Sequence, residues 1–341
     1  MTTQGWTFGD RAILAVSPCC SSPPLPGVSW IRRDDTLAFS DAWTFKRCST
    51  CLSIYLSDRP DARSLPAAYR SYYTHASTDE SEPTAGHEQM NSWIAGFLNK
   101  RFNMDYPRGS SAGAAILQLI PPARRALELY GRNIPRSLCN ERTRLLDVGC
   151  GNGEFLTRAM SMKINAFGCE PDPTAAAQCI SQGLPVIAGD AFSTELPQQS
   201  FHYITLNHVV EHVEDPQLLL ERLRTLLRPD GCLWLGLPNP TALGVGLFGN
   251  GWKGFHPPFH LLIPHQELLQ RWLLDAGFRD VRILSRGLQS GGMWSESSRI
   301  FARENGHDSF WRRKAKLAAD FATLVRPSLS EETIMIARPT A

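Results

Sequence analysis

Short apolar runs alternate with amphipathic segments along the C-terminal two thirds of this 341-residue chain. The clearest run covers residues 145–148 and leads through a glycine-rich turn into residues 154–162, where apolar side chains recur at helical spacing. Further runs that predict strands lie at 165–170, 185–189, 201–206, 232–237, 281–285 and 332–337. Helical spacing recurs at 87–98, 111–130, 174–182, 216–228, 264–276 and 309–324. The pattern predicts an α/β domain.

Two stretches interrupt this alternation. Residues 289–305 are rich in glycine and serine, and we expect an irregular connection there. Residues 238–264 combine glycine, proline and aromatic side chains, which predicts a long loop inserted into the domain. A loop of this length inside a compact domain is usually functional or disordered, and its aromatic residues favour function.

The turn after the first strand holds three glycines, Gly149, Gly151 and Gly153, and follows Asp147. Such a turn brings bare backbone N–H groups at a helix start close to an anionic ligand. The dinucleotide fingerprint G-x-G-x-x-G is absent, because Glu154 occupies its sixth position, and this disfavours a nicotinamide-dependent oxidoreductase. Taken alone, the spacing also fits an ordinary tight turn between a strand and a helix.

An acidic residue, Glu170, ends the second predicted strand about 20 residues after the first glycine, where a carboxylate can accept hydrogen bonds from ribose hydroxyls. With Asp147 and the glycines, the spacing D-x-G-x-G-x-G resembles motif I of the class I S-adenosylmethionine (SAM)-dependent methyltransferases. The resemblance implies a Rossmann-like seven-stranded sheet whose seventh strand inserts antiparallel between the fifth and sixth. It also implies that Asp147 and the glycines bind the methionyl end of SAM, Glu170 the ribose, Asp190 the adenine amine and Phe192 the adenine face.

The segment after the fourth predicted strand reads N-H-V-V-E-H-V-E-D-P from Asn207. It resembles the corresponding segment of ubiquinone-type and related methyltransferases (the type 11 and type 23 branch), which implies that Asn207 and His208 face the methyl group. His208 is a candidate general base for a hydroxyl acceptor. Glu211 and His212 could orient it, bind a divalent ion or cap the turn. The inverted zinc-protease signature H-x-x-E-H is disfavoured, because a new helix begins too soon, at Pro216.

Three residues of the 238–264 insertion, Trp252, His256 and His260, are candidates for binding the methyl acceptor. This segment resembles the loop that contributes to the acceptor pocket in the same methyltransferase branch. The alternative is that its aromatic residues cover the edge of the sheet. The aromatic and histidine side chains of the insertion suit a small-molecule, glycan or lipid-linked acceptor that is methylated at a hydroxyl oxygen.

The N-terminal part differs in composition, with a proline-rich start and a C-x-x-C pair, Cys48 and Cys51. Two thiolates at this spacing can both face a tetrahedral metal. The other half is irregular, since Cys19 and Cys20 are adjacent and Ser17 stands where a first cysteine is expected. The segment resembles the zinc-ribbon-like modules that precede some bacterial methyltransferases. Two readings stay open: zinc bound by these four cysteines, or a degenerate ribbon that folds without metal.

The division that follows is a zinc-ribbon-like module at 1–75, a linker and lid helix at 76–110, and a SAM-dependent methyltransferase domain at 111–341. Thirty-five basic and 33 acidic residues nearly balance, so no nucleic-acid partner is expected. No apolar run reaches membrane-spanning length, and no leader pattern is visible. Nine scattered cysteines fit a reducing cytoplasm. The rival function is a non-catalytic protein that binds SAM or a partner.

Overall fold

The computed structural model describes residues 10–33, 41–61, 64, 90–287, 291–306 and 310–340. The predicted linker up to residue 89 lies outside these residues, so the proposed division of the chain at 75 and 110 stays a prediction. In the described part of the chain, no helix is long and apolar enough to cross a membrane.

A seven-stranded sheet forms the centre of the molecule, in the order β12-β13-β10-β9-β6-β7-β8. Its strands are β6 (Arg144–Val148), β7 (Asn165–Glu170), β8 (Val186–Ala188), β9 (Phe201–Asn207), β10 (Leu227–Pro238), β12 (Phe278–Leu284) and β13 (Glu332–Pro339). The pairs among β6 to β10 are parallel, whereas β13 runs antiparallel between β10 and β12. The predicted fold class and the predicted place of the seventh strand are confirmed.

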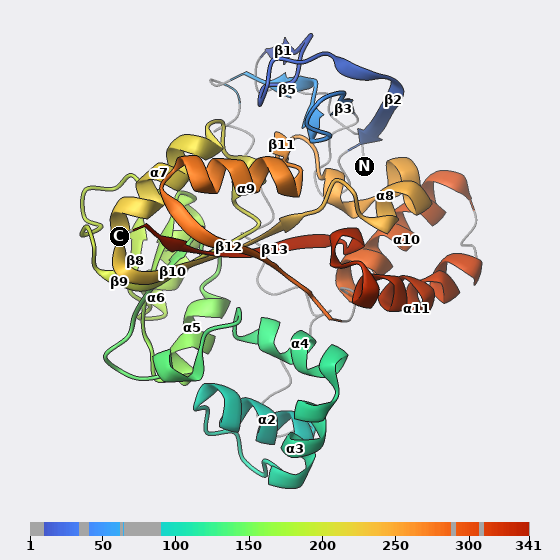
Figure 1. The fold of residues 1–341 in the computed structure, drawn as a ribbon. Helices are drawn as coiled ribbons and strands as arrows, with labels where there is room; N and C mark the ends of the chain where they lie inside the picture. Colours follow the sequence, from blue (N-terminus) through green and yellow to red (C-terminus); the bar gives the residue numbers. More distant parts are fainter. Residues whose placement is uncertain are drawn as a thin grey trace.

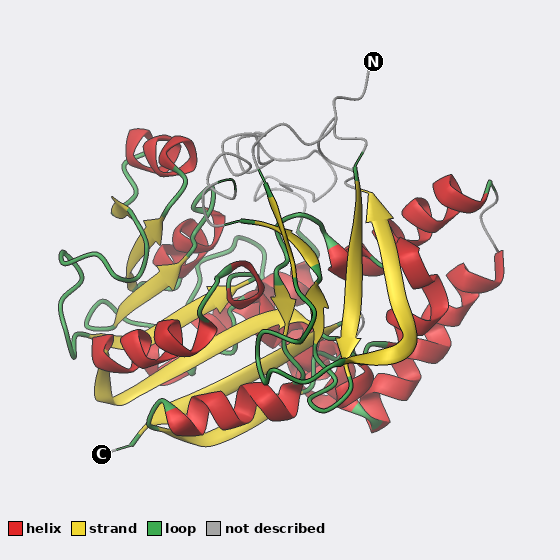
Figure 2. Cartoon of the chain, turned by 90° about the horizontal axis from the view of Figure 1, so that it is seen from above, coloured by secondary structure: helices red, strands yellow, loops and turns green. Residues whose placement is uncertain are grey.

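The helices between the strands follow the predicted amphipathic segments. They are α5 (Glu154–Ser161), α6 (Pro173–Ser181), α7 (Pro216–Leu226) and α9 (Gln266–Asp275). Proline stands at the first position of α6 and α7, each behind an aspartate whose carboxylate accepts from the first-turn amides. Figure 1 shows α7 and α9 on one side of the sheet, and α5 with α2 (Ser92–Phe102), α3 (Ser111–Leu119) and α4 (Pro121–Tyr130) on the other. Figure 2 shows the helices gathered around the strands.

The expectation of an irregular connection at 289–305 is wrong, because α10 covers Gly291–Asn305. Its buried positions include Trp294 together with Ser297 and Ser298, three and four residues later. Serines thus occupy part of the buried face of α10. Because these positions are polar, the apolar residues alone do not show the 3.6-residue period of a helix. The following helix, α11 (Phe310–Val325), agrees with the prediction for 309–324.

The N-terminal strands are β1 (Arg11–Ile13), β2 (Pro24–Arg33), β3 (Ala42–Cys48), β4 (Ile54–Leu56) and β5 (Asp58–Pro60). A strand from the predicted 238–264 loop, β11 (Leu262–Ile263), pairs antiparallel with β4 and completes a four-stranded sheet in the order β11-β4-β3-β2. The same loop contains α8 (Leu243–Phe248). The insertion is therefore structured, and it joins the two parts of the molecule.

An aromatic core fills this junction. Phe255 of the insertion is fully buried and lies 4.9 Å from Phe45 of β3 and 5.1 Å from Trp252, measured between ring centroids. Trp43, Phe248 and Trp294 belong to the same cluster of packed side chains. The N-terminal sheet and the insertion thus share one hydrophobic core.

We predict that Phe255→Ala lowers the free energy of unfolding by about 3–5 kcal/mol, because it leaves a cavity in this core. Urea unfolding followed by circular dichroism measures the loss. Leu317→Ala, at a side chain that is 75% exposed, is the control and should change stability by less than about 0.5 kcal/mol. A loss in Phe255→Ala no larger than in this control would contradict a shared core.

Candidate functional site

The glycine turn after β6 combines tight packing with one open position. All three glycines have positive φ, at +66° for Gly149, +54° for Gly151 and +78° for Gly153. A Cβ atom at Gly149 would lie 2.7 Å from Val209, and one at Gly153 would lie 2.3 Å from Leu184. A Cβ at Gly151 would meet nothing within 4 Å. The turn thus presents bare backbone to open space at Gly151, as a closely approaching ligand requires.

Glu170 ends β7 beside this turn. Its carboxylate accepts one hydrogen bond from the Gly151 amide at 2.8 Å and another from the Asp172 amide at 2.9 Å. Burial raises the pKa of Glu170, although the two amides oppose the shift. Glu170, which the sequence suggested for binding ribose, therefore lies against the glycine turn that it suggested for the methionyl end of SAM. Both carboxylate oxygens of Glu170 accept hydrogen bonds from backbone amides.

Asp190, Phe192 and Asn207 lie at the ends of the neighbouring strands. Asp190 follows β8, is exposed, and accepts a hydrogen bond from the Phe192 amide at 2.9 Å. The Phe192 side chain is 44% exposed. Asn207 ends β9 opposite Gly236 of β10, and its side chain is exposed. Because β6 to β9 are parallel, these groups meet at one edge of the sheet.

Asp147 lies below this edge. It is 1% exposed, pairs with the Arg132 guanidinium and accepts a hydrogen bond from the Thr205 hydroxyl at 2.8 Å. Arg132 also lies over the Phe155 ring, 3.6 Å from its centroid. Burial raises the pKa of Asp147 and lowers that of Arg132, and their mutual attraction opposes both shifts. The Asp147 backbone thus leads directly into the glycine turn. Its side chain is buried and pairs with Arg132 and Thr205.

His208 bridges two carboxylates. Its Nδ1 lies 3.0 Å from Oε1 of Glu211, and its Nε2 lies 2.9 Å from Oε1 of Glu332. Glu211 is fully buried, whereas the Glu332 side chain is 11% exposed and also pairs with Arg286. A single imidazole can donate to both carboxylates only when both of its ring nitrogens carry protons.

A second group of histidines lies behind His208. Nε2 of His260 lies 3.9 Å from Oε1 of Glu211, and the ring centroids of His212 and His260 are 4.6 Å apart. His260 Nδ1 donates to the Gly254 carbonyl at 2.8 Å, in the tautomer that this acceptor requires. Burial lowers the pKa of His212 and His260 to about 3, so both rings are neutral. Glu211, His212 and His260 place three possible metal ligands within 4.8 Å of one another.

With this geometry in view, residues 123–283 match the family model described as "Methyltransferase domain". The ubiquinone biosynthesis O-methyltransferase of Pseudomonas putida is 28% identical over 153 residues, which cover 40% of this chain and 64% of that protein. A Chelativorans protein of the same name is 27% identical over 162 residues, covering 43% of this chain and 63% of the relative. The chain thus spans less than two thirds of the length of either relative.

Solved structures are also similar. A SAM-dependent methyltransferase from Archaeoglobus fulgidus matches with a TM-score of 0.44 and 23% identity, covering 71% of this chain and 97% of that one. Phosphoethanolamine N-methyltransferase 2 from Haemonchus contortus matches with a TM-score of 0.44 and 14% identity, covering 74% and 61%.

Residues 123–283 therefore resemble a methyltransferase domain, and the strand order of the large sheet is that of the class I methyltransferase fold. The sheet order and the family match agree with the resemblance that the glycine motif carries.

The fold buries all three residues that the sequence suggested for acceptor binding. Trp252 is fully buried, and its indole N–H donates to Oε2 of Glu331 at 2.7 Å. His256 and His260 are 7% and 5% exposed. Trp252 packs in the junction between the insertion and the N-terminal sheet, whereas His256 packs against His260, which lies near Glu211 and His212.

Three of the N-terminal cysteines, Cys19, Cys20 and Cys51, place their sulfur atoms within 4.8 Å of one another, and the Cys48 sulfur lies next to that of Cys20. Sulfur–sulfur distances are 3.2 Å for Cys19–Cys51, 3.3 Å for Cys20–Cys48 and 3.7 Å for Cys20–Cys51. Thiolates around a tetrahedral zinc, at about 2.3 Å from the metal, lie about 3.8 Å apart. The Thr50 and Cys51 amides each point at the Cys48 sulfur, at 3.4 Å. Hydrogen bonds with Cys19 and with Ser53 lower the pKa of the Cys51 thiol to about 4.

The sequence analysis did not identify three residues of the site, Arg132, Arg286 and Glu332. Glu332 carried a usable signal, because it and Glu331 are consecutive acids at the start of an otherwise apolar strand. Arg132 follows a helix without a motif, and its partner Asp147 is 15 residues away. Only the folded chain brings these charges together.

We predict that Arg132→Met lowers the free energy of unfolding by about 3–5 kcal/mol, because the Asp147 carboxylate remains buried without its partner. Chemical denaturation measures the loss, with Arg142→Met, at an exposed side chain, as the matched control. Adding Asp147→Asn to Arg132→Met should restore part of the stability, since the unpaired charge is gone. If the double variant were as unstable as the sum of the two single variants, the ion pair would not be the cause.

Proposed function

We propose that this chain transfers the methyl group of SAM to a hydroxyl oxygen of a small-molecule, glycan or lipid-linked acceptor. The observation that carries the proposal is the set of polar groups at one edge of the sheet. Asn207, Gly151, Glu170 and Asp190 lie in this order at the carboxyl ends of four adjacent parallel strands, β9, β6, β7 and β8, as an extended cofactor would require.

In this proposal the open backbone at Gly151 lies against the methionyl end of SAM. Glu170 receives the ribose hydroxyls, and Asp190 and Phe192 receive the adenine. The exposed positions of Asp190, Phe192 and Asn207 leave these side chains available for a ligand. Asp147 acts as a positioning residue, since its carboxylate is engaged by Arg132 and Thr205 beneath the turn.

When bound, SAM supplies a methyl group on a positively charged sulfur, which an oxygen nucleophile displaces in line. His208 would take the proton of the acceptor hydroxyl at Nε2, after the proton that this nitrogen donates to Glu332 has passed to that carboxylate. SAM would supply the methyl group and leave as its neutral thioether. Of the two carboxylates on His208, Glu332 is the one that yields to the acceptor, because it is the less buried and has Arg286 as a second partner. Glu211 then holds Nδ1–H and directs the lone pair of Nε2 toward the substrate.

A second candidate function, a SAM-binding protein without turnover, is favoured by one observation. Both ring nitrogens of His208 contact carboxylates, which leaves no nitrogen for a substrate in this arrangement. Turnover on a panel of hydroxylated acceptors separates the two functions, since both require SAM binding.

We predict that S-adenosylhomocysteine, the product of SAM, raises the melting temperature by a few degrees at 100 times its Kd, where binding contributes about 2.7 kcal/mol. Glu170→Ala and Asp190→Ala should each abolish the shift at the same concentration. Glu195→Ala, at an exposed acid beyond Asp190, is the control and should keep it. A wild-type protein that is folded and shows no shift would refute the assignment of this site to SAM.

We also propose that Cys19, Cys20, Cys48 and Cys51 bind one zinc ion. The short sulfur–sulfur distances and the amides that point at Cys48 support a set of thiolates around a common centre. The role is structural, because four protein ligands leave no open coordination position. The zinc ion would hold the loop before β2, which carries Cys19 and Cys20, next to the end of β3, which carries Cys48.

We predict about one zinc per chain in protein purified without chelator, measured by elemental analysis, and a lower melting temperature after chelation. Cys51→Ser should lose the metal. Cys232→Ser, at a cysteine of the large sheet, should retain it. Folded protein that contains no zinc and does not change its melting temperature on zinc addition would favour the degenerate ribbon.

A further inference from the structure

A pocket of about 470 Å³ lies between the N-terminal sheet and the insertion. It is within the size range of small-molecule sites. One wall comes from β2 and β3, through Trp30 and Arg47, and the other from the segment that follows β10. The full lining comprises Trp30, Arg47, Pro240, Thr241, Ala242, Val245, Gly246 and Gly249.

Arg47 is the charged group of this pocket. It is half-buried, and burial lowers the pKa of its guanidinium. Its Nη2 donates to the Pro240 carbonyl at 2.7 Å, and the group lies 5.5 Å from the Trp30 ring centroid. Among the described residues, Arg47 has no acidic partner, and no carboxylate contributes to the shift of its pKa. A desolvated guanidinium without a counter-charge attracts carboxylates and phosphates, which match its fork of donors.

The position of the pocket suits an acceptor. Asn207, which we place beside the methyl group, is paired with Gly236 of β10. Pro240 lies four residues beyond Gly236, which is at most about 13 Å along an extended chain. An acceptor that spans about this length can therefore extend from the methyl site to Arg47.

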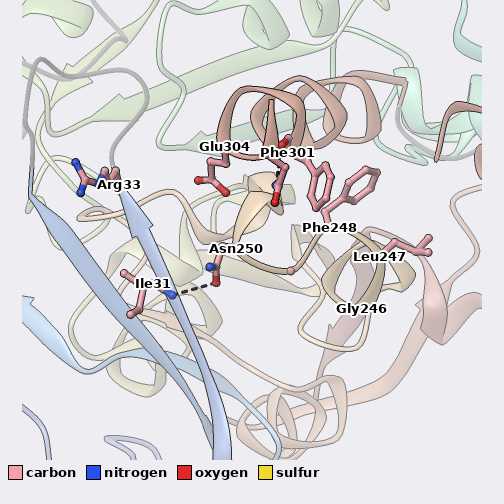
Figure 3. A pocket seen from close by; sticks show the side chains of 10 residues that line it. Ile31, Arg33, Gly246, Leu247, Phe248, Asn250, Phe301 and Glu304 are labelled. Carbon is pink, nitrogen blue, oxygen red and sulfur yellow. Dashed lines mark hydrogen bonds between the residues drawn. The ribbon is translucent and has the colours of Figure 1, made fainter. Parts of the chain in front are cut away.

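A neighbouring pocket of about 570 Å³ shows a different charge pattern. It is lined by Arg33 and Glu304, with Phe248 and Phe301 (Figure 3), so both signs of charge are present. Glu304 pairs with Arg32 at 2.7 Å, and Asn250 occupies the free edge of β2 by accepting from the Ile31 amide at 3.1 Å. Arg33 therefore offers a matched control for Arg47.

We propose that Arg47 and Trp30 form an anion subsite for the methyl acceptor, so that the substrate carries a carboxylate or phosphate group away from its accepting hydroxyl. This inference rests on the proposed function and specifies the substrate class of the same site. It gives the N-terminal sheet a role in substrate binding. The guanidinium forms charge-assisted hydrogen bonds with the anion, and Trp30 excludes water from one side.

The test is isothermal titration of protein saturated with S-adenosylhomocysteine, with two pairs of probes. One pair is 3,4-dihydroxybenzoate and catechol, which differ by a carboxylate. The other is glucose 6-phosphate and glucose, which differ by a phosphate. We expect the wild-type protein to bind at least one anionic probe about 10- to 100-fold more tightly than its neutral counterpart. The pair that shows the preference identifies the anion.

Arg47→Gln should remove this preference while leaving the affinity for S-adenosylhomocysteine unchanged. Its amide can still donate toward Pro240, and Arg47→Lys, which keeps the charge, should retain part of the preference. Arg33→Gln should behave like the wild type. No preference in the wild type, or an equal preference in Arg47→Gln, would overturn the proposal. Failure of S-adenosylhomocysteine to bind would instead refute the proposed function.

Discussion

The pairing of β4 with β11 is the contact on which the arrangement of this chain depends. Two residues of the insertion, Leu262 and Ile263, extend the N-terminal sheet and thereby fix one side of the insertion. The other side is held by Glu331, which accepts from the Trp252 indole and from the Gly244 amide. A segment with the composition of a loop becomes a rigid layer between two sheets because both of its sides are occupied.

The residues that hold this layer also lie next to His208 of the candidate site. Glu331 immediately precedes β13 and Glu332 begins it, and successive side chains along an extended backbone point to opposite faces. Glu331 holds the insertion, and Glu332 contacts His208. The backbone of Leu261 in the insertion donates to the Glu211 carbonyl at 2.8 Å. The residues that hold the insertion in place are therefore next to those that position His208. Its position depends on Glu211, on Glu332 of β13 and, through the Glu211 backbone, on the insertion.

The large sheet could be predicted because its information is local. Each strand is a short apolar run, each helix has an apolar stripe, and the glycine turn is contiguous with its strand. The inward serines of α10 and the pairing of β11 could not be predicted, since polar groups on a buried face and a two-residue strand have no period. The partners of Asp147 and His208 were missed for a related reason: Arg132 and Glu332 acquire their meaning only through tertiary contacts. Trp252 shows the opposite error: its aromatic side chain in the insertion suggested a binding residue, but it is buried in the core.

The shared aromatic core has a consequence for how this architecture arose and how it can be recombined. A module that keeps its own core can move between proteins as a cassette, but here Phe45 on one side and Phe255 on the other complete each other. Grafting the N-terminal strands onto another protein would leave the β4 edge and its apolar face uncovered unless the insertion were transferred with them. Across evolution, the two segments are therefore expected to be gained, lost and altered as one inherited unit.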